Sequence, residues 1–388
     1  MYELLVKDGT VIDPVQGIHT QKDIGISQGR ITALACGIAP SEARRIIDAK
    51  GKIVTPGLID IHCHVSEVIL FGAVAPDKAG VLSGVTTVCD GGSTGYANFL
   101  SFRRFVIPQA RTDVFCFLNM SSTGLVVLPE IRSWQDIDPE AMLGTIEENR
   151  DVIKGIKLRW VGSVMQNLGV EGVRVAKNIA TKAGLPLMVH IGKDHREEAL
   201  PEDTVNAFTR DMLSLLDKGD IITHIFTWKP GAVIRSDGSM FPEFKKAMQR
   251  GVLLDMCQGG SHWSFDVARK ALEQGILPTT MSTDLSIYSI DDTPNVLMTM
   301  SKFLAVGLSL EQLVEMTTIN PARILGEEHN RGSLGIGMPA DISILELTEG
   351  DFLFSDGIEG KTFKGTLLLL PKLTLKSGIE IATQPHVK

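Results

Sequence analysis

Hydrophobic and polar positions follow two different patterns along the chain. Residues 1–55 contain only short apolar runs of the kind typical of β-strands. Turn signals separate these runs at Asp8-Gly9, Asp13-Pro14 and Gln28-Gly29. Similar short runs return near the end of the chain, at residues 341–345, 365–370 and 373–375. Because no helical period separates the runs, we expect residues 1–55 and 326–388 to pair into one small β-sandwich domain.

Strand-like and helix-like segments alternate between these two ends, in residues 56–325. Eight β-type runs occur at residues 58–64, 84–90, 112–119, 155–159, 185–190, 220–224, 252–256 and 279–284. Amphipathic helical patterns separate most of them, at residues 171–183, 203–216, 241–249 and 265–273. The runs recur about every 32 residues, which is the length of one βα unit. Eight such units predict an α/β fold, a (β/α)₈ TIM barrel over residues 56–325. An open, doubly wound sheet is the second interpretation, although it does not require eight evenly spaced units.

Composition narrows the class of protein. The net charge is −8, and acidic and basic residues are mixed along the chain, so no basic patch for nucleic acid is expected. The sequence has no apolar stretch of about 18 residues and no signal-peptide pattern at its start, so we expect no membrane partner and a cytoplasmic location. The five cysteines are scattered without a paired motif, which suits a reducing compartment.

Histidines and one aspartate occur where the predicted strands end. The run Pro56-Gly57-Leu58-Ile59-Asp60-Ile61-His62-Cys63-His64 places two histidines two residues apart, so both side chains point to one face of a strand. His190, His224 and Asp284 close three later strands, and Lys157 lies on a fourth. The carboxyl ends of barrel strands form the face that carries active sites. These residues therefore predict a metal site, with zinc as the first choice and manganese, iron or cobalt as alternatives. Each histidine by itself could also be an ordinary core residue.

The order of these residues resembles a known superfamily. The pattern from Gly57 to His64, followed by Lys157, His190, His224 and Asp284, is similar to the amidohydrolase superfamily in its dihydroorotase-like, binuclear branch. The segments 320–326 and 332–341 are also similar to the return of that superfamily to its β-sandwich.

The resemblance implies two divalent metal ions and a CO₂-derived carbamate on Lys157 that bridges them. It implies that His62, His64 and Asp284 hold the more buried ion, and that His190 and His224 hold the more exposed one. Lys154 is the rival for the carbamate, but strand alternation favours Lys157. A metal-bridging hydroxide would attack an amide or ester carbonyl, and Asp284 would be the catalytic residue that takes its proton and passes it to the leaving group.

The substrate is less closely defined. Dihydroorotases carry an arginine two residues after the second histidine, and this chain has Ser66 there, which argues against dihydroorotate. The strand 155–159 looks like that of deacetylases acting on N-acyl amino acids or O-acyl hydroxy acids. We expect a small acylated carboxylate as substrate, with Arg159 as a bidentate anchor for the carboxylate and His262 as a donor to a substrate oxygen. Arg159 could instead be a surface residue, and His262 could simply pack a loop.

Two other functions remain open. A cyclic amide hydrolase of the dihydroorotase, hydantoinase or dihydropyrimidinase type would use the same metal ligands. An inactive scaffold protein would be expected to have lost ligands, whereas this chain keeps all six. We also expect a homo-oligomer, although the sequence gives no number of subunits.

Overall fold

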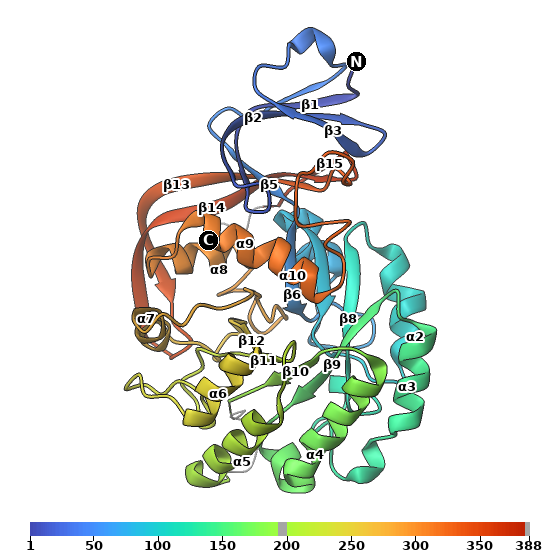
Figure 1. Cartoon of the computed structure of the whole chain (residues 1–388), viewed down its shortest axis with the longest axis vertical. Coiled ribbons are helices and arrows are strands. Elements are labelled where there is room, and N and C mark those ends of the chain that lie inside the picture. The colour runs from blue at the N-terminus through green and yellow to red at the C-terminus, as the bar shows by residue number, and fades with distance from the viewer. Residues whose placement is uncertain (193–199, 385–388) are drawn as a thin grey trace.

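The computed structural model of the chain describes residues 1–192 and 200–384, and two sheets organise it (Figure 1). The strands of the first sheet are β1 (Leu4–Asp13), β2 (Ile18–Ser27), β3 (Arg30–Ala35), β4 (Ile46–Asp48), β5 (Ile53–Pro56), β13 (Ile342–Ser355), β14 (Thr362–Lys376) and β15 (Ile379–Ala382). They run in the order β15-β14-β13-β5-β1-β2-β3, and β4 pairs with β1. Most neighbours are antiparallel, but β4 and β5 run parallel to β1. The two ends of the chain therefore share one sheet.

The junction between the chain ends is both hydrogen-bonded and apolar. Strand β5 pairs with β1 on one side and with β13 on the other. One buried cluster includes Val6 and Val54 from the first segment and Ile342 and Leu375 from the last. The domain boundaries expected at residues 55/56 and 325/326 stay a prediction, and residues 385–388 of the predicted 326–388 segment lie outside the described residues.

One expected turn in this sheet is wrong, and two strands expected to be separate are one. Asp8-Gly9 lies inside the continuous strand β1, where the register shifts between Val6 and Gly9 and Asp8 has a φ of 62°. The runs 365–370 and 373–375 likewise belong to the single strand β14, in which Pro371 lies beside a second register shift. A left-handed residue or a proline suits a β-bulge as well as a turn, and a local sequence signal does not separate the two.

The second sheet contains seven parallel strands in sequence order. They are β6 (Leu58–Cys63), β7 (Val85–Asp90), β8 (Asp113–Asn119), β9 (Ile153–Arg159), β10 (Leu187–His190), β11 (Ile221–Thr223) and β12 (Leu253–Asp255). The eighth predicted strand, residues 279–284, is not a regular strand. Thr280 forms a parallel bridge to Asp255, and Leu285 forms one to Cys63, so this segment contacts both edge strands.

Helices follow most of these strands and cover the outer side of the sheet (Figure 1). They are α1 (Pro76–Ala79), α2 (Phe99–Ser101), α3 (Pro139–Glu148), α4 (Gly162–Ala183), α5 (Glu202–Leu215), α6 (Pro242–Arg250), α7 (Phe265–Glu273), α8 (Val296–Ala305), α9 (Leu310–Thr317) and α10 (Ile319–Ile324). Helix α7 has the predicted bounds. Helix α4 begins earlier than predicted, because a kink at Gly169, with a φ of 56°, joins a preceding helical segment to the predicted one. Within the two described ranges, every helix is too short or too polar to cross a membrane.

Candidate metal centre

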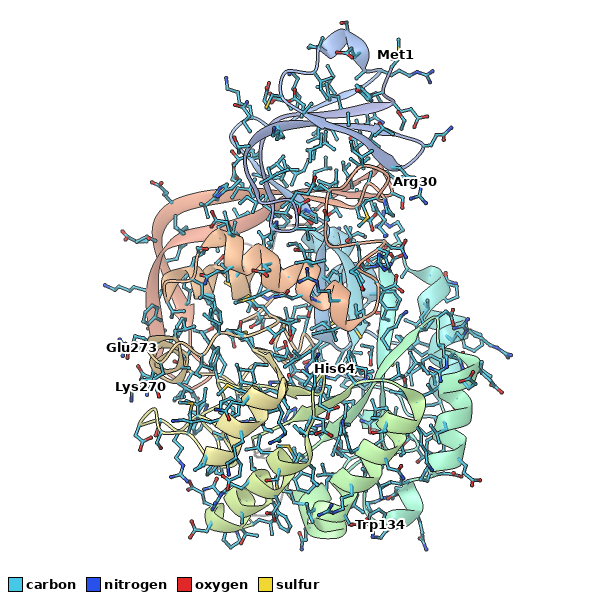
Figure 2. All side chains as sticks on the ribbon, viewed as in Figure 1. Met1, Arg30, His64, Trp134, Lys270 and Glu273 are labelled. Carbon is cyan, nitrogen blue, oxygen red and sulfur yellow. The ribbon has the colours of Figure 1, made fainter. Side chains whose placement is uncertain are left out.

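The two histidines of the first parallel strand point into the molecule. His62 lies in β6 and His64 directly follows it, with a distance of 5.8 Å between their ring centroids. The strand is less regular than expected, because its register against β7 shifts between Asp60 and Cys63. A bulge of this kind re-aims side chains at the end of a strand. Figure 2 labels His64 in the interior of the body formed by the parallel sheet and its helices.

Alternation in β9 and β10 places the next candidates. Ile156, Leu158 and Val189 pack outwards into the large hydrophobic cluster, so Lys157, Arg159 and His190 face the opposite side. Lys157 lies opposite Met188, and Arg159 lies opposite His190. These three side chains therefore approach the same end of the sheet as His62 and His64.

The last two candidates depend on unusual backbone conformations. His224 has a φ of 66° and Asp284 has a φ of 52°. His224 follows Thr223, which faces inwards, so regular alternation would turn the imidazole of His224 outwards. The left-handed conformation redirects it. Residues other than glycine rarely adopt this backbone conformation, and those that do are concentrated at functional sites.

These side chains come within a few ångströms of one another. Asp284 Oδ1 lies 2.9 Å from His64 Nε2 and 3.5 Å from His62 Nε2. The Lys157 Nζ lies 2.8 Å from His62 Nε2. The ring centroids of His190 and His224 are 4.2 Å apart. The structure thus brings all six predicted ligands together.

Neighbouring groups fix the orientation of three of the imidazoles. The Nδ1 atom of His62 lies 3.1 Å from Thr223 Oγ1, and that of His64 lies 2.8 Å from Ser93 Oγ. The Nδ1 of His224 lies 3.0 Å from the carbonyl oxygen of Cys257. With Nδ1 engaged, each ring directs its Nε2 towards the other candidate ligands. Metal-binding histidines typically use their second nitrogen in this way.

The glycines after β7 leave room for this arrangement. A Cβ atom on Gly91 would lie 2.1 Å from Cδ2 of His62, and one on Gly92 would lie 2.7 Å from Cγ of Lys157. A larger residue at either position would displace a candidate ligand.

The charges in the site match those that a metal requires. Burial lowers the pKa of His62, lowers that of His190 well below its usual value, and lowers that of His224 to about 3, so these rings are neutral. Burial alone would raise the pKa of Asp284, but His64 and the other histidines hold it well below its usual value, so the carboxylate is ionised. Among the described residues, the buried Nε2 atoms of His190 and His224 have no hydrogen-bond partner. Neutral imidazoles with free lone pairs and an ionised carboxylate fit a divalent metal ion.

The two lysines that compete for the carbamate lie in different environments. Lys157 is buried, and burial lowers the pKa of its amine to about 8. Lys154 forms an ion pair with Glu327 at 2.8 Å, at the opposite end of β9. Only Lys157 is in contact with the predicted metal ligands.

A cavity of about 820 Å³ opens beside the cluster. Five of the predicted ligands line it, namely His62, His64, Lys157, His190 and Asp284, whereas His224 is buried behind them. Arg159 and His262 also line this cavity, so neither predicted substrate-binding residue is a surface or purely loop-packing residue. Ser66 is buried outside it.

Both substrate-binding candidates already contact other charged groups. The Arg159 Nη1 donates to both carboxylate oxygens of Glu130, each at 3.0 Å. The Nε2 of His262 lies 3.1 Å from Lys229 Nζ. Because an ammonium group only donates, His262 Nε2 accepts this hydrogen bond, and the ring proton of the neutral imidazole is on Nδ1.

Sequence reasoning missed several residues of the site. Asp255 accepts hydrogen bonds from Thr223, Thr280 and Ser282 beneath the histidines, and Glu130 contacts Arg159 from a loop. Asp255 lies one residue before the end of a predicted strand and could have been found by its position, as Asp284 was. Glu130 lies in a loop without a motif, so no local signal pointed to it.

Comparison with known proteins identifies the class of this site. The amidohydrolase family model matches residues 53–373. A deacetylase of Agrobacterium fabrum is 35% identical over 365 residues, which cover 92% of this chain and 86% of that protein. A crystal structure of a dihydroorotase matches with a TM-score of 0.84 and 30% identity, over 99% of this chain and 100% of that one. A crystal structure of an adenine deaminase matches with a TM-score of 0.87 and 28% identity, over the same shares of the two chains.

The chain therefore belongs to the amidohydrolase family. It is a hydrolase that acts on a small-molecule substrate, and its cluster of buried histidines suits the divalent metal that this family generally uses.

Proposed function

We propose that the protein removes the acyl group from a small acylated carboxylate, either an N-acyl amino acid or an O-acyl hydroxy acid. The observation that carries this proposal is a single cavity lined by both the candidate metal ligands and Arg159. The 35% identity to a named deacetylase supports the same reaction. A cyclic amide hydrolase is the second candidate, supported by the resemblance to a dihydroorotase structure at 30% identity.

We also propose that residues 56–325 close into a complete (β/α)₈ barrel, with residues 279–285 as the eighth strand. The parallel bridges from this segment to Asp255 and Cys63 support closure, since they join the two edges of the seven-stranded sheet. The mixed sheet of the chain ends would then form the accessory β-sandwich. A homo-oligomer and a cytoplasmic location remain expectations from the sequence.

The residues of the centre fit two divalent ions, for which zinc is our first choice. His62, His64 and Asp284 would hold one ion, and His190 and His224 the other, with carbamylated Lys157 between them. The lowered pKa of the Lys157 amine supports this role, because only a neutral amine attacks CO₂. Bound ions of this kind supply an activated water at neutral pH and polarise the substrate carbonyl.

Residues of this chain supply proton transfer and substrate binding. Asp284 is ionised and lines the cavity, so it can accept a proton from the attacking water and return it to the leaving nitrogen or oxygen. Arg159, which lines the cavity and pairs with Glu130, binds the substrate carboxylate through its guanidinium. His262 donates its Nδ1 proton to a substrate oxygen.

Hydrolysis rates on a small set of substrates test the proposal. Protein purified with zinc and bicarbonate would be given an α-acetoxy acid, an N-acetyl amino acid, dihydroorotate and adenine side by side, with Asp284→Asn as the background control. We expect acetate release from the acetylated acids and no ring opening. Ring opening alone would favour the cyclic amide hydrolase, and ammonia release from adenine alone would show that the protein is a deaminase.

A further inference from the structure

Cys257 lies beside two of the clustered histidines, His62 and His224. The residue follows β12, and its place in the alternation with Asp255 turns its side chain inwards, whereas Leu254 and Met256 pack outwards into the large hydrophobic cluster. Its side chain is fully buried. One ligand atom each from His62, His224, Cys257 and Asp284 lie within 4.8 Å of one another, and the Cys257 atom is its Sγ.

A second observation points to a ligand at this position. His224 belongs to the same group, and its buried Nε2 has no hydrogen-bond partner in the described parts of the chain. The Nδ1 of the same ring contacts the carbonyl oxygen of Cys257 at 3.0 Å, so the cysteine backbone helps to orient His224. Two imidazoles, a carboxylate and a thiol at this spacing form a donor set typical of zinc rather than of magnesium or manganese.

Two of the other cysteines lie away from the cluster. Cys116 faces outwards from β8 into the large hydrophobic cluster, and Cys36 is exposed directly after β3. Neither belongs to a group that could hold a metal among the residues that the structure describes. The thiol at position 257 is therefore distinguished by its place in the cluster rather than by its burial.

We propose that Cys257 is a metal ligand of this centre and gives it a soft, sulfur-containing donor set. The inference rests on the metal site of the proposed function and adds a residue to it. Coordination breaks the S–H bond, forms a metal–sulfur bond and releases one proton to solvent for each ion bound through sulfur. A thiolate ligand favours zinc, cobalt and cadmium over manganese and magnesium.

Cobalt substitution tests this ligand directly. Full-length protein in a Cys36→Ser background, which removes the exposed thiol, would be loaded with Co²⁺, dialysed and assayed for bound cobalt. We expect a near-ultraviolet sulfur-to-cobalt charge-transfer band. The band should be lost in Cys257→Ser and in Cys257→Ala and retained in the matched control Cys116→Ser. Full cobalt loading without the band, or a band that survives both substitutions at position 257, would overturn the proposal.

A second measurement covers the case in which the Cys257 variants fail to fold. X-ray absorption at the zinc edge of the Cys36→Ser protein should show sulfur at about 2.3 Å from the metal. A shell of nitrogen and oxygen alone would rule Cys257 out.

Acyl hydrolysis by the same cobalt protein separates this inference from the proposed function. Hydrolysis without the band would reject the thiolate ligand and leave the deacetylase reaction standing. The band without hydrolysis would keep the ligand and reject the substrate class. A protein that retains no cobalt after dialysis would contradict both.

Discussion

Single residues of the site adopt conformations that only the complete fold can hold. His224 and Asp284 are both left-handed, and each such residue costs about 1–3 kcal/mol. Neighbouring strands hold both residues in place: the Asp284 amide donates to the carbonyl oxygen of His62 at 2.7 Å, and His224 Nδ1 contacts the carbonyl oxygen of Cys257. The surrounding strands and loops therefore hold these site residues in a fixed position.

Replacing Lys157 with alanine should remove at least one metal ion and nearly all hydrolytic activity. The amine is buried and lies 2.8 Å from His62 Nε2. Metal content and initial rates measured in bicarbonate would check this. Lys154→Ala is the matched control, since Lys154 pairs with Glu327 instead, and it should keep both metals. Loss of metal and activity in Lys154→Ala but not in Lys157→Ala would assign the carbamate to Lys154.

Replacing Arg159 with methionine should raise KM for acylated carboxylates by about 10- to 100-fold, with a smaller change in kcat. A charge-assisted hydrogen bond contributes about 1.5–3 kcal/mol, and 1.4 kcal/mol corresponds to tenfold in affinity. The substitution also leaves Glu130 buried without its Arg159 partner, so Glu130→Gln is needed as a control for that effect. An unchanged KM in Arg159→Met would show that the anchor lies elsewhere.

Helix α8 illustrates what a whole element adds. It lies against β14, where the Leu369 amide donates to Ser301 Oγ at 2.9 Å, and it is buried along most of its length (Figure 1). One of its buried residues is Lys302, whose Nζ is 3.4 Å from the carbonyl oxygen of Asp292 and 5.5 Å from the ring centroid of Trp263. Burial lowers the pKa of Lys302 to about 8, although Asp292 and Asp356 oppose the shift. The helix therefore carries a charged group in its packed face at neutral pH.

The contribution of Lys302 to the free energy of unfolding should rise between about pH 8 and pH 10.5. In this range the unfolded chain keeps the proton that the folded chain has lost, and the gain approaches about 3 kcal/mol. Lys302→Met should flatten this rise, so its Tm relative to wild type is higher at pH 7 than at pH 10. Thermal scans at both pH values would show the difference. The exposed Lys50→Met serves as control, and an equal pH dependence in wild type and Lys302→Met would contradict the prediction.

At the scale of the whole molecule, the segment after α10 fastens the last part of the chain to the parallel sheet. Arg331 Nη1 donates to Thr87 Oγ1 at 2.7 Å and to Asp113 Oδ2 at 2.9 Å, and its Nη2 contacts Glu327. Thr87 lies near the start of β7 and Asp113 begins β8, so these contacts lie at the end of the sheet opposite the metal ligands. These stabilising contacts and the candidate metal centre thus lie at opposite ends of the sheet.

Arg331→Met should consequently destabilise the protein without altering its catalytic constants. Loss of three hydrogen bonds from a partly buried guanidinium should cost about 2–3 kcal/mol and lower Tm by about 3 °C. Thermal unfolding and rates at 25 °C would be measured together. A change in kcat/KM at unchanged Tm would mean that this end of the sheet does influence the site.

The sequence by itself determined the parallel strands β6 to β12, the presence of β-segments at both chain ends and the six candidate ligands. These follow from local period and from the rule that parallel strands present their carboxyl ends at one edge. The tertiary structure determined the features that depend on contacts between distant parts of the chain. It showed that Asp8-Gly9 lies at a bulge, that residues 279–285 bridge two edges without forming a regular strand, and that Glu130 and Cys257 reach the site. These outcomes depend on partners far away in the chain, and a local pattern carries no information about a partner's position.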